Sequence, residues 1–177
     1  NVNTIDATGI SVGDYTLTVT TVPDGNHNAV SKSASVTVTK VHSTIEPISP
    51  ISIVYGDSGS VTVVTTGATG VTAELYSGET KLNDTVSVSG NVITIKNNVD
   101  AGEYTLKVTT IPDGNHNAAS TTANVTVIKA DSTIADISPI SVGFGESASV
   151  TVVTSGATGV NAELVGTTGK VSVDGNV

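Results

Sequence analysis

Apolar and polar residues alternate with a period of two along most of the chain, in short segments separated by turns rich in Gly, Pro, Asn and Asp. The turns recur about every ten residues, the spacing of strands in sandwiches and barrels. We expect residues 43–53 to form a split edge strand, because Pro47 and Pro50 cannot donate ladder hydrogen bonds. The pattern therefore predicts a seven- or eight-strand sandwich, whose further strands cover residues 61–65, 71–76, 86–88, 91–96, 103–110 and 120–128.

One predicted strand shows the alternation most clearly. Tyr104, Leu106 and Val108 fall on one face, whereas hydroxyl-bearing and charged residues fall on the other. We expect the apolar face to belong to the core, where Val125 and Val127 of the last strand would meet it.

A seven-residue stretch, PDGNHNA, occupies residues 23–29 and returns unchanged at residues 112–118, which sets an offset of 89 positions. Tyr15 and Tyr104 share this offset. Similarity at a fixed period marks a tandem array. We call residues 112–118 the heptad loop and residues 23–29 the N-terminal heptad loop.

The repeat divides the chain into three predicted parts. Residues 41–129 form a complete repeat, residues 1–40 the C-terminal half of one, and residues 130–177 the N-terminal half of another. No Gly- or Pro-rich spacer separates them, so we expect a stiff array.

Neither predicted half can bury its apolar face alone, and each would leave strand edges unpaired. Two explanations remain open. The sequence can be a stretch of a much longer array of repeats. Alternatively, residues 130–177 of one chain are completed by residues 1–40 of the next, which would give a head-to-tail fibre by β-strand complementation.

Charge and composition argue against several classes of function. The formal net charge is −9, so there is no basic patch for nucleic acid or for an anionic membrane surface. No apolar run approaches the roughly 20 residues that a transmembrane helix needs. The chain contains no Cys, and no Ser or His falls in a recognisable nucleophile motif. We therefore predict no enzymatic activity and no cofactor.

Two short stretches carry a family resemblance. Residues 100–106, DAGEYTL, and residues 11–17, SVGDYTL, look like the tyrosine corner of an immunoglobulin-like strand F. The wider pattern resembles the immunoglobulin-like repeats of adhesin-like surface proteins from methanogenic archaea and Gram-positive bacteria. The resemblance implies tandem immunoglobulin-like β-sandwich domains in a rod, with four structural residues: Tyr15, Leu17, Tyr104 and Leu106.

The same resemblance implies a function. Such repeats serve as structural parts of an extracellular adhesin, stalk or fibre at the cell surface. The expected partners are adjacent repeats, identical subunits, or the surface of a host or neighbouring cell.

The sequence of each heptad loop is typical of a hairpin turn. Pro stands at the start of the turn, Asp-Gly would supply a positive φ, and Asn would cap the start of the returning strand. In an immunoglobulin sandwich the heptad loop, between strands F and G, would face the preceding domain near Lys40, Val41 and His42. The candidate interdomain and binding residues of the two loops are Asp24, Asn26, His27, Asn28, Asp113, Asn115, His116 and Asn117.

An alternative function is a calcium- or glycan-dependent binding module that uses these loops. Asp113 leads an alternation of oxygen-bearing side chains like the start of a calcium loop, and Asp57 and Asp100 lie in loops at the other end of the domain. Glu74 and Asn124 could also belong to a Lys–Asn isopeptide crosslink, although Glu74 reads equally well as part of a solvated strand face.

Overall fold

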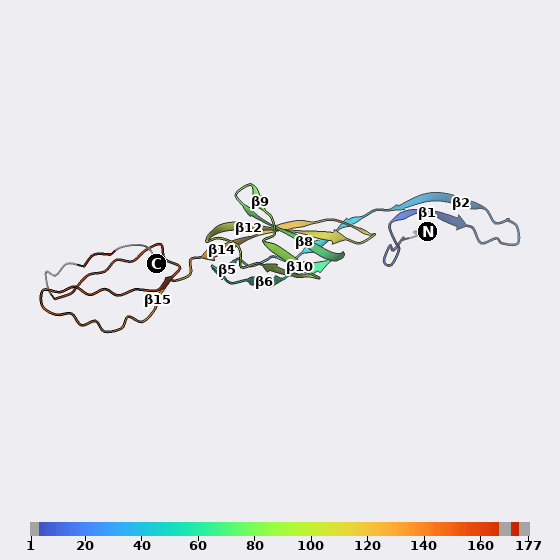
Figure 1. The fold of residues 1–177 in the computed structure, drawn as a ribbon. Coiled ribbons are helices and arrows are strands. Elements are labelled where there is room, and N and C mark those ends of the chain that lie inside the picture. Colours follow the sequence, from blue (N-terminus) through green and yellow to red (C-terminus); the bar gives the residue numbers. More distant parts are fainter. Residues whose placement is uncertain (1–3, 167–170, 174–177) are drawn as a thin grey trace. The chain divides into compact units, whose positions relative to one another are not determined.

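The computed structural model describes residues 4–166 and 171–173. Its regular structure is entirely β (Figure 1). No helix long and apolar enough to cross a membrane occurs in the described part of the chain. The strands are β1 (Gly13–Thr20), β2 (Ser31–Val38), β3 (Val41–His42), β4 (Thr44–Ile45), β5 (Ile51–Val54), β6 (Gly59–Thr62), β7 (Thr65–Thr66), β8 (Ala68–Ser77), β9 (Thr80–Leu82), β10 (Val86–Ser89), β11 (Val92–Ile95), β12 (Gly102–Pro112), β13 (His116–Asn117), β14 (Ser120–Ile128), β15 (Thr133–Ile134) and β16 (Thr154–Ser155).

The central repeat is a sandwich of two main sheets. One sheet has the order β10-β11-β6 and the other the order β5-β14-β12-β8-β9. All neighbours are antiparallel except β5 and β14, which run parallel. In immunoglobulin terms these sheets correspond to strands D-E-B and A′-G-F-C-C′. The predicted immunoglobulin-like β-sandwich is therefore confirmed.

The first strand of this sandwich is split, as the two prolines predict. Its first part, β4, pairs with β7 in a separate two-stranded sheet, and its second part, β5, pairs with β14 in the five-stranded sheet. Pro47 and Pro50 lie between these parts, where no ladder bond is required of them. Because of this split, residues 44–54 pair with two different sheets.

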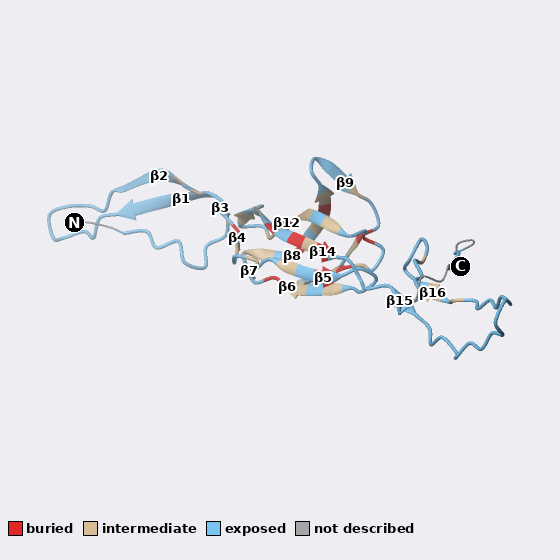
Figure 2. Ribbon diagram, turned by 90° about the vertical axis from the view of Figure 1, so that its left-hand side faces the viewer, coloured by how far each residue is buried: buried red, intermediate tan, exposed pale blue. Residues whose placement is uncertain are grey.

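The core lies between the two main sheets. Leu106, Val108 and Val125 are fully buried, and Val127 is nearly so. Tyr104 is half-buried and packs against the same cluster. These are the residues that the alternation selects. Ile53 of β5 and Val71 and Leu75 of β8 add to this buried face from the same sheet. Ile93 and Ile95 of β11 are buried in the other main sheet, and Val63, just after β6, is buried as well. The buried residues, in red, gather on the strands of the central repeat (Figure 2).

The hairpin of β1 and β2 repeats the pairing of β12 and β14. Tyr15 faces Val36 across this hairpin, as Tyr104 faces Val125 in the central repeat. Burial differs, because Leu17 is 36% exposed where its equivalent Leu106 is fully buried. Within the part of the chain that the structure describes, the hairpin thus has the strand pairing of the central repeat without the opposing sheet.

The chain divides into two compact units, Asn1–Ile128 and Lys129–Val177. In the second unit, the strands found among the described residues are β15 and β16, which pair with each other. The division into partial and complete repeats remains a prediction.

The sequence pattern does not predict three of the short strands: β3, β9 and β13. β9 follows a tight turn at Gly78, which adopts a positive φ of 57°. β3 and β13 have two residues each, too few to show any periodicity, and they pair with each other in parallel. This last pairing brings the heptad loop against the start of the repeat.

Candidate functional site

The two predicted tyrosine corners are both formed. The Tyr104 hydroxyl donates to the Asp100 carbonyl oxygen at 2.8 Å. The Tyr15 hydroxyl donates to the Ser11 carbonyl oxygen at 2.6 Å. Each bond ties a strand to the turn four residues earlier.

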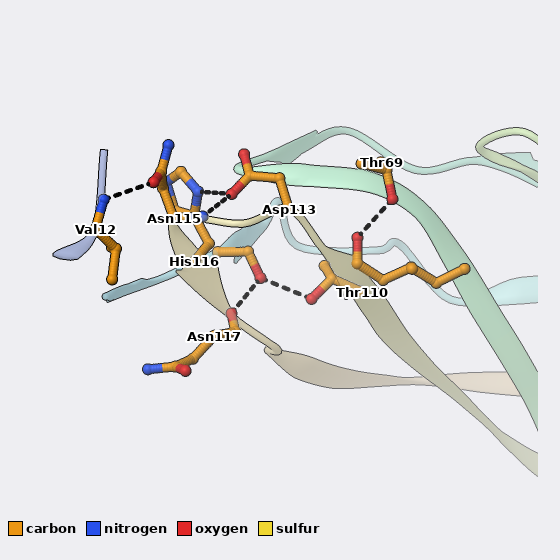
Figure 3. A network of polar contacts seen from close by, with 9 residues as sticks. Val12, Thr69, Thr110, Asp113, Asn115, His116 and Asn117 are labelled. Atoms are coloured by element: carbon orange, nitrogen blue, oxygen red, sulfur yellow. Dashed lines mark hydrogen bonds and ion pairs between the residues drawn. The ribbon is translucent and has the colours of Figure 1, made fainter. Parts of the chain in front are cut away.

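The heptad loop is held in shape by one carboxylate. Asp113 Oδ1 accepts the backbone N–H of Asn115 at 2.8 Å and lies 2.6 Å from His116 Nδ1 (Figure 3). A turn closed by an Asp side chain needs no left-handed residue. Gly114 accordingly does not adopt a positive φ, so the expected Asp-Gly turn with a positive φ is wrong.

The N-terminal heptad loop has the same internal bonds. Asp24 Oδ1 accepts the N–H groups of Asn26 and His27 at 2.8 Å and lies 2.8 Å from His27 Nδ1. Yet the His27 side chain is 79% exposed, against 24% for that of His116. The loop shape is thus a local property of its sequence and does not depend on a neighbouring surface.

In the central repeat the loop has a neighbour on each side. A Cβ atom placed on Gly67 would lie 2.3 Å from the His116 ring, so only glycine leaves room for this imidazole. Gly67 also has a φ of 69°, in the left-handed region. Its carbonyl oxygen accepts the Asp113 N–H at 3.4 Å.

On its other side the heptad loop pairs with the segment that enters the repeat. His116 and Asn117 align with Val41 and His42 as β13 and β3. The N–H of Val41 donates to the Asn115 carbonyl oxygen at 3.3 Å. The loop therefore lies against Val41 and His42, the position that the sequence analysis expects.

Ser43 completes this pairing below the surface. Its N–H and its hydroxyl both donate to the Asn117 carbonyl oxygen at 2.9 Å, and its Oγ lies 2.7 Å from Thr110 Oγ1. Ser43 and Thr110 are each only 3% exposed. Thr110 Oγ1 also accepts the Ala119 N–H at 2.8 Å. Such a satisfied buried network fixes backbone geometry, because losing one partner leaves another group unpaired.

One bond reaches the preceding half-repeat directly. Asn115 Oδ1 accepts the N–H of Val12 at 2.9 Å (Figure 3). Val12 immediately precedes β1. The heptad loop thus contacts both the entering segment and the repeat from which that segment comes.

The aspartate of each heptad loop has a lowered pKa. The hydrogen bond with His116, followed by the bond from the Asn115 N–H, lowers the pKa of Asp113 from its ordinary value of 3.8. In the N-terminal loop, the Asn26 N–H and then His27 lower the pKa of Asp24 in the same way. Both carboxylates are therefore held in the acceptor form that closes the turn.

Among residues 4–166 and 171–173, no group of three or more His, Cys, Asp or Glu side chains is placed to share a metal ion. Asp113 already uses Oδ1 within its own turn. Asp57 donates its N–H to Val54, and the Asp100 carbonyl accepts the Tyr104 hydroxyl. The calcium role of Asp57, Asp100 and Asp113 remains a prediction. The side chains of Asn28 and Asn117 have no hydrogen bond in the described structure, so the part expected of them in binding also remains a prediction.

Glu74 is a surface residue with partners of its own. It lies 2.5 Å from Lys81 Nζ and accepts the Tyr76 hydroxyl at 2.8 Å. Asn124 is exposed on β14 and pairs with Thr105. Glu74 therefore belongs to a solvated strand face, which leaves it no role as a buried crosslink carboxylate.

Sequence reasoning missed three residues of this site: Ser43, Thr110 and Gly67. Each recurs at the repeat offset, as Ser132, Thr21 and Gly156. Thr21 even reproduces the local bond, because its Oγ1 accepts the Val30 N–H at 2.9 Å. The recurrence was a usable signal, but Ser, Thr and Gly are so common in this chain that it does not stand out.

Comparisons with known proteins identify no family for this chain. No protein-family model matches the chain, and no curated protein matches it. Among solved structures, the chain resembles a three-immunoglobulin-domain fragment of titin with an E-to-A mutation (18% identity, TM-score 0.35) and an I-band fragment of titin (19% identity, TM-score 0.35). Each match covers 68% of this chain and 42% of the other chain. The fold assignment rests on the strand order and the tyrosine corners described above.

Proposed function

We propose that this chain is a non-enzymatic structural repeat of an extracellular stalk, adhesin or fibre, in which successive immunoglobulin-like domains are held at a fixed junction. One observation carries the proposal: the heptad loop bonds to the segment that enters its repeat and to the repeat before it.

The junction contains features that oppose bending. The entering segment is a paired strand, β3, and not a free linker. The next residue, Ser43, is bonded below the surface to Thr110 and Asn117. Bending is thereby confined to Thr39 and Lys40, between β2 and β3, and it has to break the bond between the Val12 N–H and Asn115 Oδ1.

The extracellular setting is supported by the sequence resemblance and by the composition. Exposed strand faces are rich in Thr and Ser, and hydroxyl pairs such as Thr18–Ser33 and Thr109–Ser120 line them at 2.9 and 3.0 Å. A net charge of −9 favours solubility outside the cell. Labelling intact source cells with an antibody against this chain tests the location, and labelling only after lysis would contradict it.

The junction is tested by pulsed electron paramagnetic resonance on the full chain. The chain has no native Cys, so Thr16→Cys and Ser87→Cys, both at exposed positions, accept two spin labels cleanly. We expect one narrow distance distribution, unchanged by calcium or a chelator. A distribution as broad as that of two flexibly linked domains would contradict the proposal.

A matched pair of variants assigns the effect to the loop. Asn115→Ala removes the acceptor of the Val12 N–H and should broaden the distribution. Asn26→Ala makes the same change in the N-terminal heptad loop, where the side chain has no partner in the described structure, and should leave the distribution unchanged. Equal broadening by both variants would mean that the loop does not hold the junction.

A further inference from the structure

One side of the central sandwich is closed by the split first strand. β5 is an outer strand of the five-stranded sheet and pairs there with β14. Ile53 of β5 also packs on Gly59 of β6, an outer strand of the other main sheet, where an added Cβ atom would lie 2.7 Å from the Ile53 side chain. Pro47 and Pro50 precede β5, and Pro hinders the pairing of a foreign strand.

The other side of the sandwich has two outer strands without such a cover. β9 is the outer strand of the five-stranded sheet on this side, and β10 that of the three-stranded sheet (Figure 1). An edge strand presents unpaired N–H and C=O groups, which natural proteins protect with charges, Pro or a covering segment. β10 reads Val-Ser-Val-Ser, with neither charge nor Pro, and its Val88 is 38% exposed. This edge therefore lacks protection from its own sequence.

Residues 83–85 join these two outer strands and read Asn-Asp-Thr. Asn-X-Thr is the acceptor sequence for an N-linked sugar chain, and it is expected in a surface loop of a secreted protein. Asn83 is exposed and lies in a turn, as the motif requires. A second such sequence, residues 124–126, lies in β14 between β5 and β12, where a sugar chain would cover no edge.

The turn is held by groups other than the Asn83 side chain. Asp84 has a φ of 57°, and its carboxylate pairs with Lys96. The Lys96 N–H donates to the Thr85 carbonyl oxygen at 2.8 Å, and the Thr85 hydroxyl donates to the Leu82 carbonyl oxygen at 3.1 Å. None of these bonds uses the Asn83 amide, so a substituent on its nitrogen leaves the turn intact.

We propose that Asn83 carries an N-linked sugar chain, which covers the edges of β9 and β10. The proposal rests on the extracellular location in the proposed function, because the acceptor sequence is used in secreted proteins. A sugar chain is bulky and solubilising, so it keeps a second strand away from both edges.

The transfer needs a sugar joined through C1 to a lipid phosphate. The Asn83 amide nitrogen bonds to C1, the bond between C1 and the phosphate oxygen breaks, the amide loses one proton, and the lipid phosphate leaves. The motif requires the Thr85 hydroxyl, yet Thr85 is only 7% exposed in the fold. The transfer therefore precedes formation of the turn.

Peptide mapping by mass spectrometry of the full chain from its source cells tests the site. Cleavage after Lys places Asn83 in the peptide 82–96 and Asn124 in the peptide 108–129. We expect a sugar mass on the peptide 82–96 that Asn83→Gln removes and Asn124→Gln leaves in place. An unmodified Asn83 in a chain that antibody labelling places at the cell surface would overturn the inference and leave the proposed function intact. A sugar-free chain found only inside the cells would overturn both.

The covering role is tested by aggregation on gentle heating, followed by light scattering. The Asn83→Gln chain should aggregate at least about threefold faster than the chain with its sugar. Adding Ser87→Lys should restore slow aggregation, because it places a charge on the β10 edge.

Thr94→Lys is the matched control for the added charge. Thr94 lies opposite Ser87 in the β10–β11 pairing, but β11 is the middle strand of its sheet. Added to Asn83→Gln, it should leave aggregation fast. The melting of the central repeat checks folding in all variants. Equal aggregation with and without the sugar, or equal rescue by the two lysines, would overturn the inference.

Discussion

Leu106 and Leu17 occupy the same position of two repeats and differ in what covers them. Leu106 is fully buried between the sheets, whereas Leu17 lies 36% exposed on the hairpin. Substituting a fully buried leucine by alanine removes its contacts and leaves a cavity, at a cost of about 2–5 kcal/mol. For a domain with a total stability of about 5–15 kcal/mol, Leu106→Ala is a severe change.

Leu17→Ala is the matched comparison. No opposing sheet covers Leu17 among residues 4–166 and 171–173, so the loss of its side chain leaves no closed cavity there. Leu106→Ala should lower the melting temperature by about 10–25 °C, taking about 3 kcal/mol at 4–8 °C per kcal/mol for a domain of this size. Leu17→Ala should leave that transition within about 4 °C, since a surface change usually alters stability by no more than about 0.5 kcal/mol.

Calorimetry and urea denaturation of the full chain at low concentration measure both effects. An equal loss in both variants would refute the reasoning, because it would mean that Leu17 lies in a core of the same kind within one chain.

Three further predictions concern single bonds. Tyr104→Phe removes the hydroxyl that donates to Asp100 and should cost about 1 kcal/mol in urea unfolding, whereas no loss would mean that the corner is not stabilising. Thr110→Val leaves the buried Ser43 hydroxyl without one partner and should lower the free energy of unfolding by about 1–3 kcal/mol. Thr21→Val, the same change at the exposed equivalent position, should lower it little, and equal losses in the two variants would contradict this account. Acid should destabilise the fold, because hydrogen bonds with Lys81, Lys96 and His116 respectively lower the pKa of Glu74, Asp84 and Asp113. Each carboxylate adds stability above its unfolded pKa, near 4, and loses it as the pH falls through the lower folded value, so the urea midpoint should drop between pH 5 and pH 2, and a flat profile would contradict this.

Periodicity was sufficient to predict the sandwich and its core. Tyr104, Leu106 and Val108 alternate with polar residues, and one buried face is what that alternation requires. The split of the first strand also followed from sequence, since Pro47 and Pro50 leave few other solutions.

The junction could not be predicted in the same way. Pairing between β3 and β13 involves two residues on each side, and it joins segments far apart in sequence. The heptad itself was visible as a repeated turn, but its Asp-mediated closure replaced the expected glycine conformation. The buried Ser43 and Thr110 pair looks like any other hydroxyl in a Thr- and Ser-rich chain.

The central claim is that the heptad loop holds the segment entering its repeat, and residue-resolved amide hydrogen exchange tests it most directly. The N–H groups of Val41 and Ser43 donate to carbonyl oxygens of the loop, and that of Val12 donates to the Asn115 side chain. We predict that all three exchange far more slowly than the exposed Val22 amide, and that Asn115→Ala frees only Val12. Exchange of Val41 and Ser43 at the rate of Val22 would contradict the claim, because the junction would then be an open linker.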